Sequence, residues 1–208
     1  MNKQVSITPY ICYGAAIFLN FYWIFRRNSL SLSAQLVCLF LTIALITVGS
    51  FLGAIAHSGN TKRRYLRGGV WVLFVYYLYI LSMLLFFGGL FHVYRNYTGS
   101  YNLVPFHTID NYISFFRNTG AFVSISNLVG NMVILMPFGV FFPVLFPKLR
   151  RFWVFIPIMA LIAIGVELLQ WQTGTGVADI DDSILNFLGG VLAYVFTRCA
   201  QMLGTALK

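Results

Sequence analysis

Six long apolar segments follow one another along the chain and constrain its fold more than any other feature. They occupy residues 9–25, 32–56, 70–93, 128–146, 152–171 and 184–203. Most approach the roughly 20 residues that an α-helix needs to cross about 30 Å of hydrocarbon. A helix also satisfies its own backbone hydrogen bonds, which lipid cannot do. The sequence therefore predicts an all-α fold, a multi-pass transmembrane bundle of about six helices.

The composition supports a membrane protein made of one domain. Only 9% of the 208 residues are charged and 59% are hydrophobic, whereas a soluble domain carries roughly 25% charged residues. No Ser/Pro-rich or charged linker separates the apolar segments, so we expect a single membrane domain over residues 1–208. The net charge of +9 does not indicate nucleic-acid binding, because the basic residues form short clusters between apolar segments. Membrane proteins place their topological anchors there.

The distribution of Lys and Arg predicts the orientation of the helices. With the N-terminus inside, four of the fourteen basic residues face outward, and the others face the cytoplasm; the outer four are Arg26, Arg27, Arg95 and Arg117. The positive-inside rule then places both termini in the cytoplasm. The same topology puts all five acidic residues at the outer boundary; they are Asp110, Glu167, Asp179, Asp181 and Asp182. We therefore expect a polar site at the outer membrane face.

The stretch from residue 94 to residue 126 leaves the membrane pattern without becoming strongly polar. Thr108 is placed to cap a short helix, and Gly120 to end it. The apolar side chains between them recur at i, i+3, i+4 and i+7, at Ile109, Tyr112, Ile113 and Phe116. This spacing predicts an outer amphipathic or re-entrant segment. An ordinary packed loop is the alternative.

Polar residues interrupt the fifth apolar segment near its outer end. Glu167 precedes Gln170 by three residues, so both side chains project from one helix face. A carboxylate is costly in hydrocarbon unless it is paired, hydrogen-bonded or protonated. Topology makes Arg95 and Arg117 the candidate cations for Glu167. The carboxylate belongs either to a ligand site or to a buried pair that only fixes helix packing.

An acidic turn, Asp179-Ile-Asp-Asp182, leads into the sixth apolar segment. Carboxylates at a helix N-terminus cap free N–H groups and meet the positive end of the helix dipole. Capping explains one or two of these three acids. Asp182 and Asn186 lie one turn apart on a common helix face. Together they form a polar strip that runs from the acidic turn toward the interior of the bundle.

The fourth apolar segment carries a further pair of polar residues and is rich in proline. Asn127 and Asn131 lie one turn apart and act either as hydrogen-bonded contacts between helices or as ligand contacts. Pro137, Pro143 and Pro147 interrupt the apolar pattern. Each internal proline removes a backbone hydrogen bond, so we expect a kinked helix.

The polar motifs of the second half occur in a defined order between residues 94 and 204. Arg95 comes before Asn102-Leu-Val-Pro105-Phe106, and then Asn127-Leu-Val-Gly-Asn131 leads into Leu135-Met-Pro137-Phe-Gly139 and Pro143. Glu167-x-x-Gln170 and Asp179-Ile-Asp-Asp182-x-x-x-Asn186-x-x-Gly189-Gly190 follow. This combination resembles the VanZ-like membrane protein family, although members often carry an Arg where this chain has Gly176. The resemblance implies a bacterial cell-membrane protein associated with low-level resistance to glycopeptides such as teicoplanin, without a change in the peptidoglycan precursor.

Three functions fit these residues. The first is a non-enzymatic protein that binds an envelope lipid or the lipoglycopeptide drug at the outer boundary. The second is a transporter or flippase of an amphipathic envelope lipid. The third is an intramembrane metal-dependent hydrolase, which ranks last because the sequence has no His-Glu-x-x-His and no Gly-x-Ser-x-Gly motif.

We favour the binding protein, with no cofactor, no metal and no assigned catalytic residue. Its expected partners are membrane lipids and either a lipoglycopeptide antibiotic or a cell-wall lipid precursor, and its oligomeric state stays open. The candidate ligand-binding residues are Arg95, Asn102, Arg117, Asn127, Asn131, Glu167, Gln170, Asp179, Asp182 and Asn186.

Overall fold

The chain folds almost entirely into helices. A computed structural model describes residues 7–87, 101–120 and 122–206, in which the only strands are two residues long. The chain divides into two compact units, residues 1–92 and residues 93–208. The described residues contain five candidate membrane spans by length and composition. The multi-pass helical fold that the apolar segments predict is therefore confirmed.

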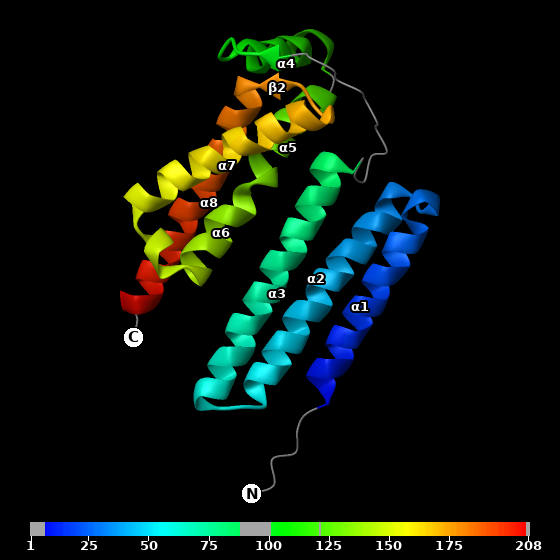
Figure 1. Ribbon diagram of the computed structural model, residues 1–208, viewed down its shortest axis with the longest axis vertical. Coiled ribbons are helices and arrows are strands. Elements are labelled where there is room, and N and C mark those ends of the chain that lie inside the picture. Colours follow the sequence, from blue (N-terminus) through cyan, green and yellow to red (C-terminus); the bar gives the residue numbers. More distant parts are fainter. Residues whose placement is uncertain (1–6, 88–100, 121, 207–208) are drawn as a thin grey trace, which may run out of the picture. The chain divides into compact units, whose positions relative to one another are not determined.

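The first unit consists of three long helices, α1 (Thr8–Arg26), α2 (Leu32–Ile55) and α3 (Gly59–Phe86). A short 3-10 turn, Arg27–Ser29, connects α1 to α2. Helix α2 lies between α1 and α3 and packs against both (Figure 1). Both α2 and α3 are candidate spans, whereas the 19-residue α1 is not among them.

Hydrogen bonds between side chains join the helices of the first unit. The hydroxyls of Tyr10 and Tyr65 lie 3.1 Å apart, and those of Tyr13 and Ser50 lie 3.0 Å apart. Gly49 faces α1, because a Cβ at this position would lie 3.0 Å from the Cβ of Cys12. Polar pairs and small residues therefore let these helices approach closely, as they do in other membrane proteins.

The second unit surrounds its last helix. Its helices are α4 (His107–Thr119), α5 (Phe122–Ile134), α6 (Met136–Leu145), α7 (Phe152–Thr173) and α8 (Ile180–Ala206), with a 3-10 turn at Pro147–Arg150. Helix α8 packs against α5, α6 and α7. Leu135, Phe155 and Met159 are fully buried in this core. Helix α4 and the short strand β2 (Ala178–Asp179) lie at one end of the unit (Figure 1).

The fourth apolar segment forms two helices rather than one. Helix α5 ends at Ile134 and α6 begins at Met136, with Leu135 between them. Pro137 lies in the first turn of α6, where its missing N–H is tolerated. Pro143 lies inside α6 and Pro147 begins the following 3-10 turn. The interruption that the prolines predict is confirmed, and it is a break rather than a simple kink.

The predicted amphipathic segment is helix α4, but its cap differs from the prediction. Ile109, Tyr112 and Ile113 are half-buried, and Gly120 ends the helix in the left-handed region at φ 64°. The prediction that Thr108 caps the helix was wrong, because the N-cap position is Phe106 and Thr108 lies inside the first turn.

Candidate functional site

Two short parallel strands bring distant parts of the second unit together. Strand β1 (Tyr101–Asn102) pairs with β2, with Tyr101 opposite Ala178 and Asn102 opposite Asp179. The side-chain amide of Asn102 donates to Asp179 Oδ1 at 3.3 Å and to Thr108 Oγ1 at 2.9 Å. The segment before α4 is thereby fixed against the turn that connects α7 to α8.

Asp179 caps the N-terminus of α8. Its Oδ1 accepts a hydrogen bond from the backbone N–H of Asp181 at 2.9 Å, which is the bond that an N-cap side chain makes. Its Oδ2 accepts from the hydroxyl of Thr108 at 2.6 Å. The capping role predicted for the acidic turn therefore belongs to Asp179, which also connects α8 to α4.

Asp181 caps a different helix, α4. Its carboxylate is fully buried, and Oδ1 accepts from the N–H of Phe106 at 2.5 Å. Oδ2 accepts from the N–H groups of Thr108 and Ile109 at 2.8 and 3.1 Å. Phe106 adopts the left-handed conformation at φ 66°, which is uncommon for a non-glycine residue. Asp181 thus satisfies the free N–H groups at the start of α4 and holds that helix to α8.

Asp182 and Asn186 extend the polar strip into the helical bundle. The amide of Asn131, on α5, donates to Asp182 Oδ1. One turn further along α8, Asn186 is only 3% exposed, and its Oδ1 has no hydrogen-bond partner among the described residues. Asn127 is exposed on α5. The predicted polar strip therefore joins α5 to α8 through Asn131.

Glu167 lies near the C-terminal end of α7 and is buried. Its Oε2 accepts a long hydrogen bond, 3.4 Å, from the backbone N–H of Asp179. Arg117 lies in the last turn of α4 and is exposed. Arg95, the other candidate cation, falls within residues 88–100 and lies outside the described residues.

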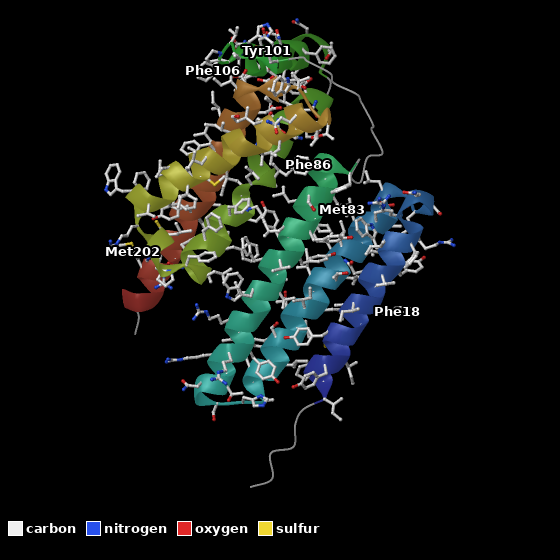
Figure 2. All side chains as sticks on the ribbon, viewed as in Figure 1. Phe18, Met83, Phe86, Tyr101, Phe106 and Met202 are labelled. Carbon is white, nitrogen blue, oxygen red and sulfur yellow. The ribbon has the colours of Figure 1, made fainter. Side chains whose placement is uncertain are left out.

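These elements enclose a pocket of about 590 Å³, which we call the acidic pocket. Five of the predicted site residues line it: Asn102, Glu167, Gln170, Asp179 and Asp182. The other seven residues that line it lie outside the predicted ligand-binding set: Tyr101, His107, Thr108, Asn111, Tyr112, Gly176 and Val177. Figure 2 shows Tyr101 and Phe106 at the α4 end of this unit. Arg117, Asn127, Asn131 and Asn186 do not line the pocket.

Comparison with known families decides what kind of protein carries this pocket. The sequence profile of the VanZ/LLP1 family matches residues 72–201, more than half of the chain. The chain belongs to the VanZ/LLP1 family. The match begins earlier than the resemblance at residues 94–204 suggested, and it includes most of α3 as well as every residue of the acidic pocket. Neither a curated protein nor a solved structure matches the chain.

In this VanZ/LLP1 protein, some carboxyl oxygens of the acidic pocket accept no hydrogen bond from the described residues. Asp179 and Asp181 accept hydrogen bonds on both oxygens. By contrast, no hydrogen bond from the described residues reaches Oε1 of Glu167 or Oδ2 of Asp182. No Lys or Arg is among the described residues that line the pocket. A carboxyl oxygen without a donor can accept a hydrogen bond, so these two oxygens favour a ligand that donates one.

The carboxylates and histidines of the second unit do not form a compact metal-binding group. Throughout residues 7–87, 101–120 and 122–206, no three or more His, Cys, Asp or Glu side chains come together in an arrangement that would hold a metal ion. The described lining of the acidic pocket offers carboxyl oxygens, amides and hydroxyls.

Proposed function

We propose that the acidic pocket binds the polar headgroup of an amphipathic cell-envelope molecule without catalysing a reaction on it. The protein would thereby protect the cell against a lipoglycopeptide antibiotic such as teicoplanin. The observation that carries this proposal is that neighbouring acids differ in how many of their carboxyl oxygens the fold uses as hydrogen-bond acceptors. Asp179 and Asp181 are used by the fold, whereas Glu167 and Asp182 each keep one oxygen without a donor among the described residues.

The lining of the acidic pocket supports a ligand with hydroxyl or ammonium groups. Three carboxylates face the pocket together with the amides of Asn102, Asn111 and Gln170, and its described lining contains no Lys or Arg. Without a Lys or Arg in its described lining, the pocket offers an anionic phosphate no cation, whereas sugar hydroxyls and ammonium groups donate hydrogen bonds to carboxyl oxygens. Glycolipids, lipoglycopeptides and amino-bearing lipid precursors have such headgroups.

The position of the acidic pocket supports an amphipathic ligand rather than a fully soluble one. Glu167 lies in the last two turns of α7 and Asp182 in the first turn of α8, and both helices are candidate membrane spans. A headgroup bound there has its apolar tail next to hydrocarbon. The Lys and Arg distribution supports an outward-facing pocket, where envelope lipids and the drug are present.

The test of this proposal removes the two unused acceptors one at a time. Fluorescent teicoplanin is titrated into purified protein in nanodiscs, with the Glu167→Gln and Asp182→Asn variants measured beside the unchanged protein. Because a hydrogen bond to a charged group contributes about 1.5–3 kcal/mol, each variant should weaken binding by about tenfold or more. Both variants should also lower the teicoplanin resistance of cells that express them.

Asp110→Asn provides the matched control for these variants. Asp110 is an exposed acid on α4 that does not line the acidic pocket, so the same loss of charge should leave binding unchanged. If all three variants bind the drug as tightly as the unchanged protein does, the acidic pocket is not the site that binds the drug. If they also confer full resistance at equal expression, the acidic pocket has no part in it.

A transporter or flippase is the second candidate, and one observation favours it. The polar strip continues from Asp182 to Asn131 and to the buried Asn186, next to the break between α5 and α6. Broken helices with polar groups at membrane depth are features of transporters. Reconstituted protein would then accelerate the movement of a labelled glycolipid between the leaflets of a vesicle, whereas a binding protein would not.

A further inference from the structure

A second pocket lies in the first unit and shares no residue with the acidic pocket. It has a volume of about 570 Å³ and is formed by α1, α2 and α3; we call it the three-helix pocket. Thr42 and Ile46 of α2 form its floor, because α2 lies between the other two helices. Ile17 and Phe21 of α1 line one wall and Val75 of α3 lines the other.

The three-helix pocket opens within the membrane span. At 1.5 Å per residue, Thr42 and Ile46 lie roughly 15 and 21 Å along α2, a helix roughly 36 Å long. Both α2 and α3 are long and apolar enough to cross a bilayer. The pocket therefore lies at the depth of the hydrocarbon, so a water-soluble ligand would have to leave water completely to reach it.

Four of the five polar side chains that line the three-helix pocket already have a hydrogen-bond partner in the protein. The amide of Asn20 donates to the hydroxyl of Tyr76 at 3.1 Å, and the hydroxyl of Thr42 donates to the carbonyl of Cys38 at 2.8 Å. The hydroxyl of Tyr13 lies 3.0 Å from that of Ser50. An occupant of this pocket therefore needs to offer few hydrogen bonds, and it meets methyl, methylene and aromatic surfaces.

The size of the pocket sets the size of its occupant. An apolar cavity of about 150 Å³ holds one benzene molecule, so the three-helix pocket has room for roughly 20 carbon atoms by the same measure. We propose that it binds one acyl chain of a membrane phospholipid. Lipid tails gain nothing from the hydrophobic effect when they move from bilayer to protein. The chain is held instead by many small dispersion contacts with the pocket walls.

Photolabelling tests whether a chain occupies the pocket rather than only the outer surface of the unit. The full-length protein is reconstituted in vesicles that contain a phospholipid with a diazirine in its acyl chain, and labelled residues are mapped by mass spectrometry. Ile17 and Val75 should be labelled several-fold more than Phe18. Phe18 is 75% exposed and projects from the side of α1 away from α2 (Figure 2). Its labelling therefore measures non-specific contact with the surrounding lipid.

Substitutions that fill the pocket test retention of the chain. Val75→Trp and Ile17→Trp place a large ring in the pocket from opposite walls, and both positions are exposed, so the fold should accept them. Val37→Trp is the matched control, because Val37 is exposed on α2 but does not line the pocket. Native mass spectrometry of protein released from phosphatidylglycerol nanodiscs should show about tenfold less bound phospholipid for the two filling variants only.

Two outcomes would overturn the proposal. Equal labelling of Phe18 and the pocket residues, or equal lipid retention in all three variants, means that the pocket holds no chain of its own. A dimer that the Val75→Trp variant dissociates, with no labelling of Ile17, means that a second copy of the protein covers the pocket. Neither result bears on the acidic pocket, since none of the three variants changes a residue that lines it.

Discussion

The two units of the chain use buried polar groups in different ways. In the first unit, side chains such as Asn20 and Tyr76 pair between helices, while Trp23 Nε1 and Gln35 Oε1 are buried without a partner among the described residues. The sequence places no acid in residues 1–92. In residues 93–208, Asp181 holds the backbone of another helix, while Glu167 and Asp182 keep unused acceptors. The comparison teaches that carboxyl oxygens to which no described residue donates, a feature that residues 1–92 cannot supply, distinguish the acidic pocket from polar groups that only join helices.

The largest effect that we expect comes from removing the acid that the second unit uses most fully. Asp181→Ala leaves the N–H groups of Phe106, Thr108 and Ile109 without their acceptor. Buried donors without an acceptor cost about 1–3 kcal/mol each. Because water can hydrogen-bond some of these N–H groups in the variant, the free energy of unfolding should fall by about 3 kcal/mol in total. Unfolding in detergent measures this loss, and hydrogen exchange at the first turn of α4 should accelerate.

Asp110→Ala is the control for this prediction. Asp110 also lies in the first turn of α4, but it is exposed. Its favourable interaction with the helix dipole is small, so the variant should lose less than about 1 kcal/mol. Equal losses at Asp181 and Asp110 would show that Asp181 does not anchor α4, and the contrast between the two units would then lose its main support.

A smaller effect should come from glycines at helix contacts, and it should again differ between the units. A Cβ at Gly189 would collide with the backbone carbonyl of Met132, whereas a Cβ at Gly53 would meet the ring of Tyr65. A backbone cannot move aside as a side chain can, so Gly189→Ala should cost about 2 kcal/mol of unfolding free energy and Gly53→Ala about half of that. Thermal unfolding compares the variants.

Gly165→Ala tests whether the cost comes from contact rather than from the loss of glycine itself. No neighbouring atom lies within 4 Å of a Cβ at Gly165, and alanine favours a helix over glycine. This variant should therefore be as stable as the unchanged protein or slightly more stable. A loss there equal to that at Gly189 would assign the effect to something other than close helix packing.

The sequence predicted the helices well because the bilayer imposes strong and simple demands on them. The segments 32–56 and 152–171 correspond to helices Leu32–Ile55 and Phe152–Thr173, since apolar length alone determines a span. The last segment was predicted to begin at residue 184, but α8 begins at Ile180. Its first turn contains acids that pair within the protein, so hydropathy does not reveal it.

The roles of the site residues were harder to predict than their positions. Asp179, Asp181 and Asp182 are close neighbours with the same capping preference, so the local sequence does not assign them to partners. The assignment follows from the pairing of β1 with β2, which fixes residues 101–102 against 178–179. Such long-range register is a tertiary property. His107, Thr108 and Asn111 line the acidic pocket for the same reason, and their only local signal was the polar side of α4.

The smallest expected effect tests whether the polar pairs of the first unit do no more than join helices. Tyr76→Phe removes the hydroxyl that accepts from Asn20 at 3.1 Å and leaves the ring in place. Side-chain hydrogen bonds between membrane helices contribute about 0.6 kcal/mol on average, so the free energy of unfolding should fall by about that amount. A double-mutant cycle with Asn20→Leu isolates the pair. A coupling of about 3 kcal/mol would give this pair the weight that we assign to Asp181, and the two units would then no longer differ in how strongly their polar groups stabilise the fold.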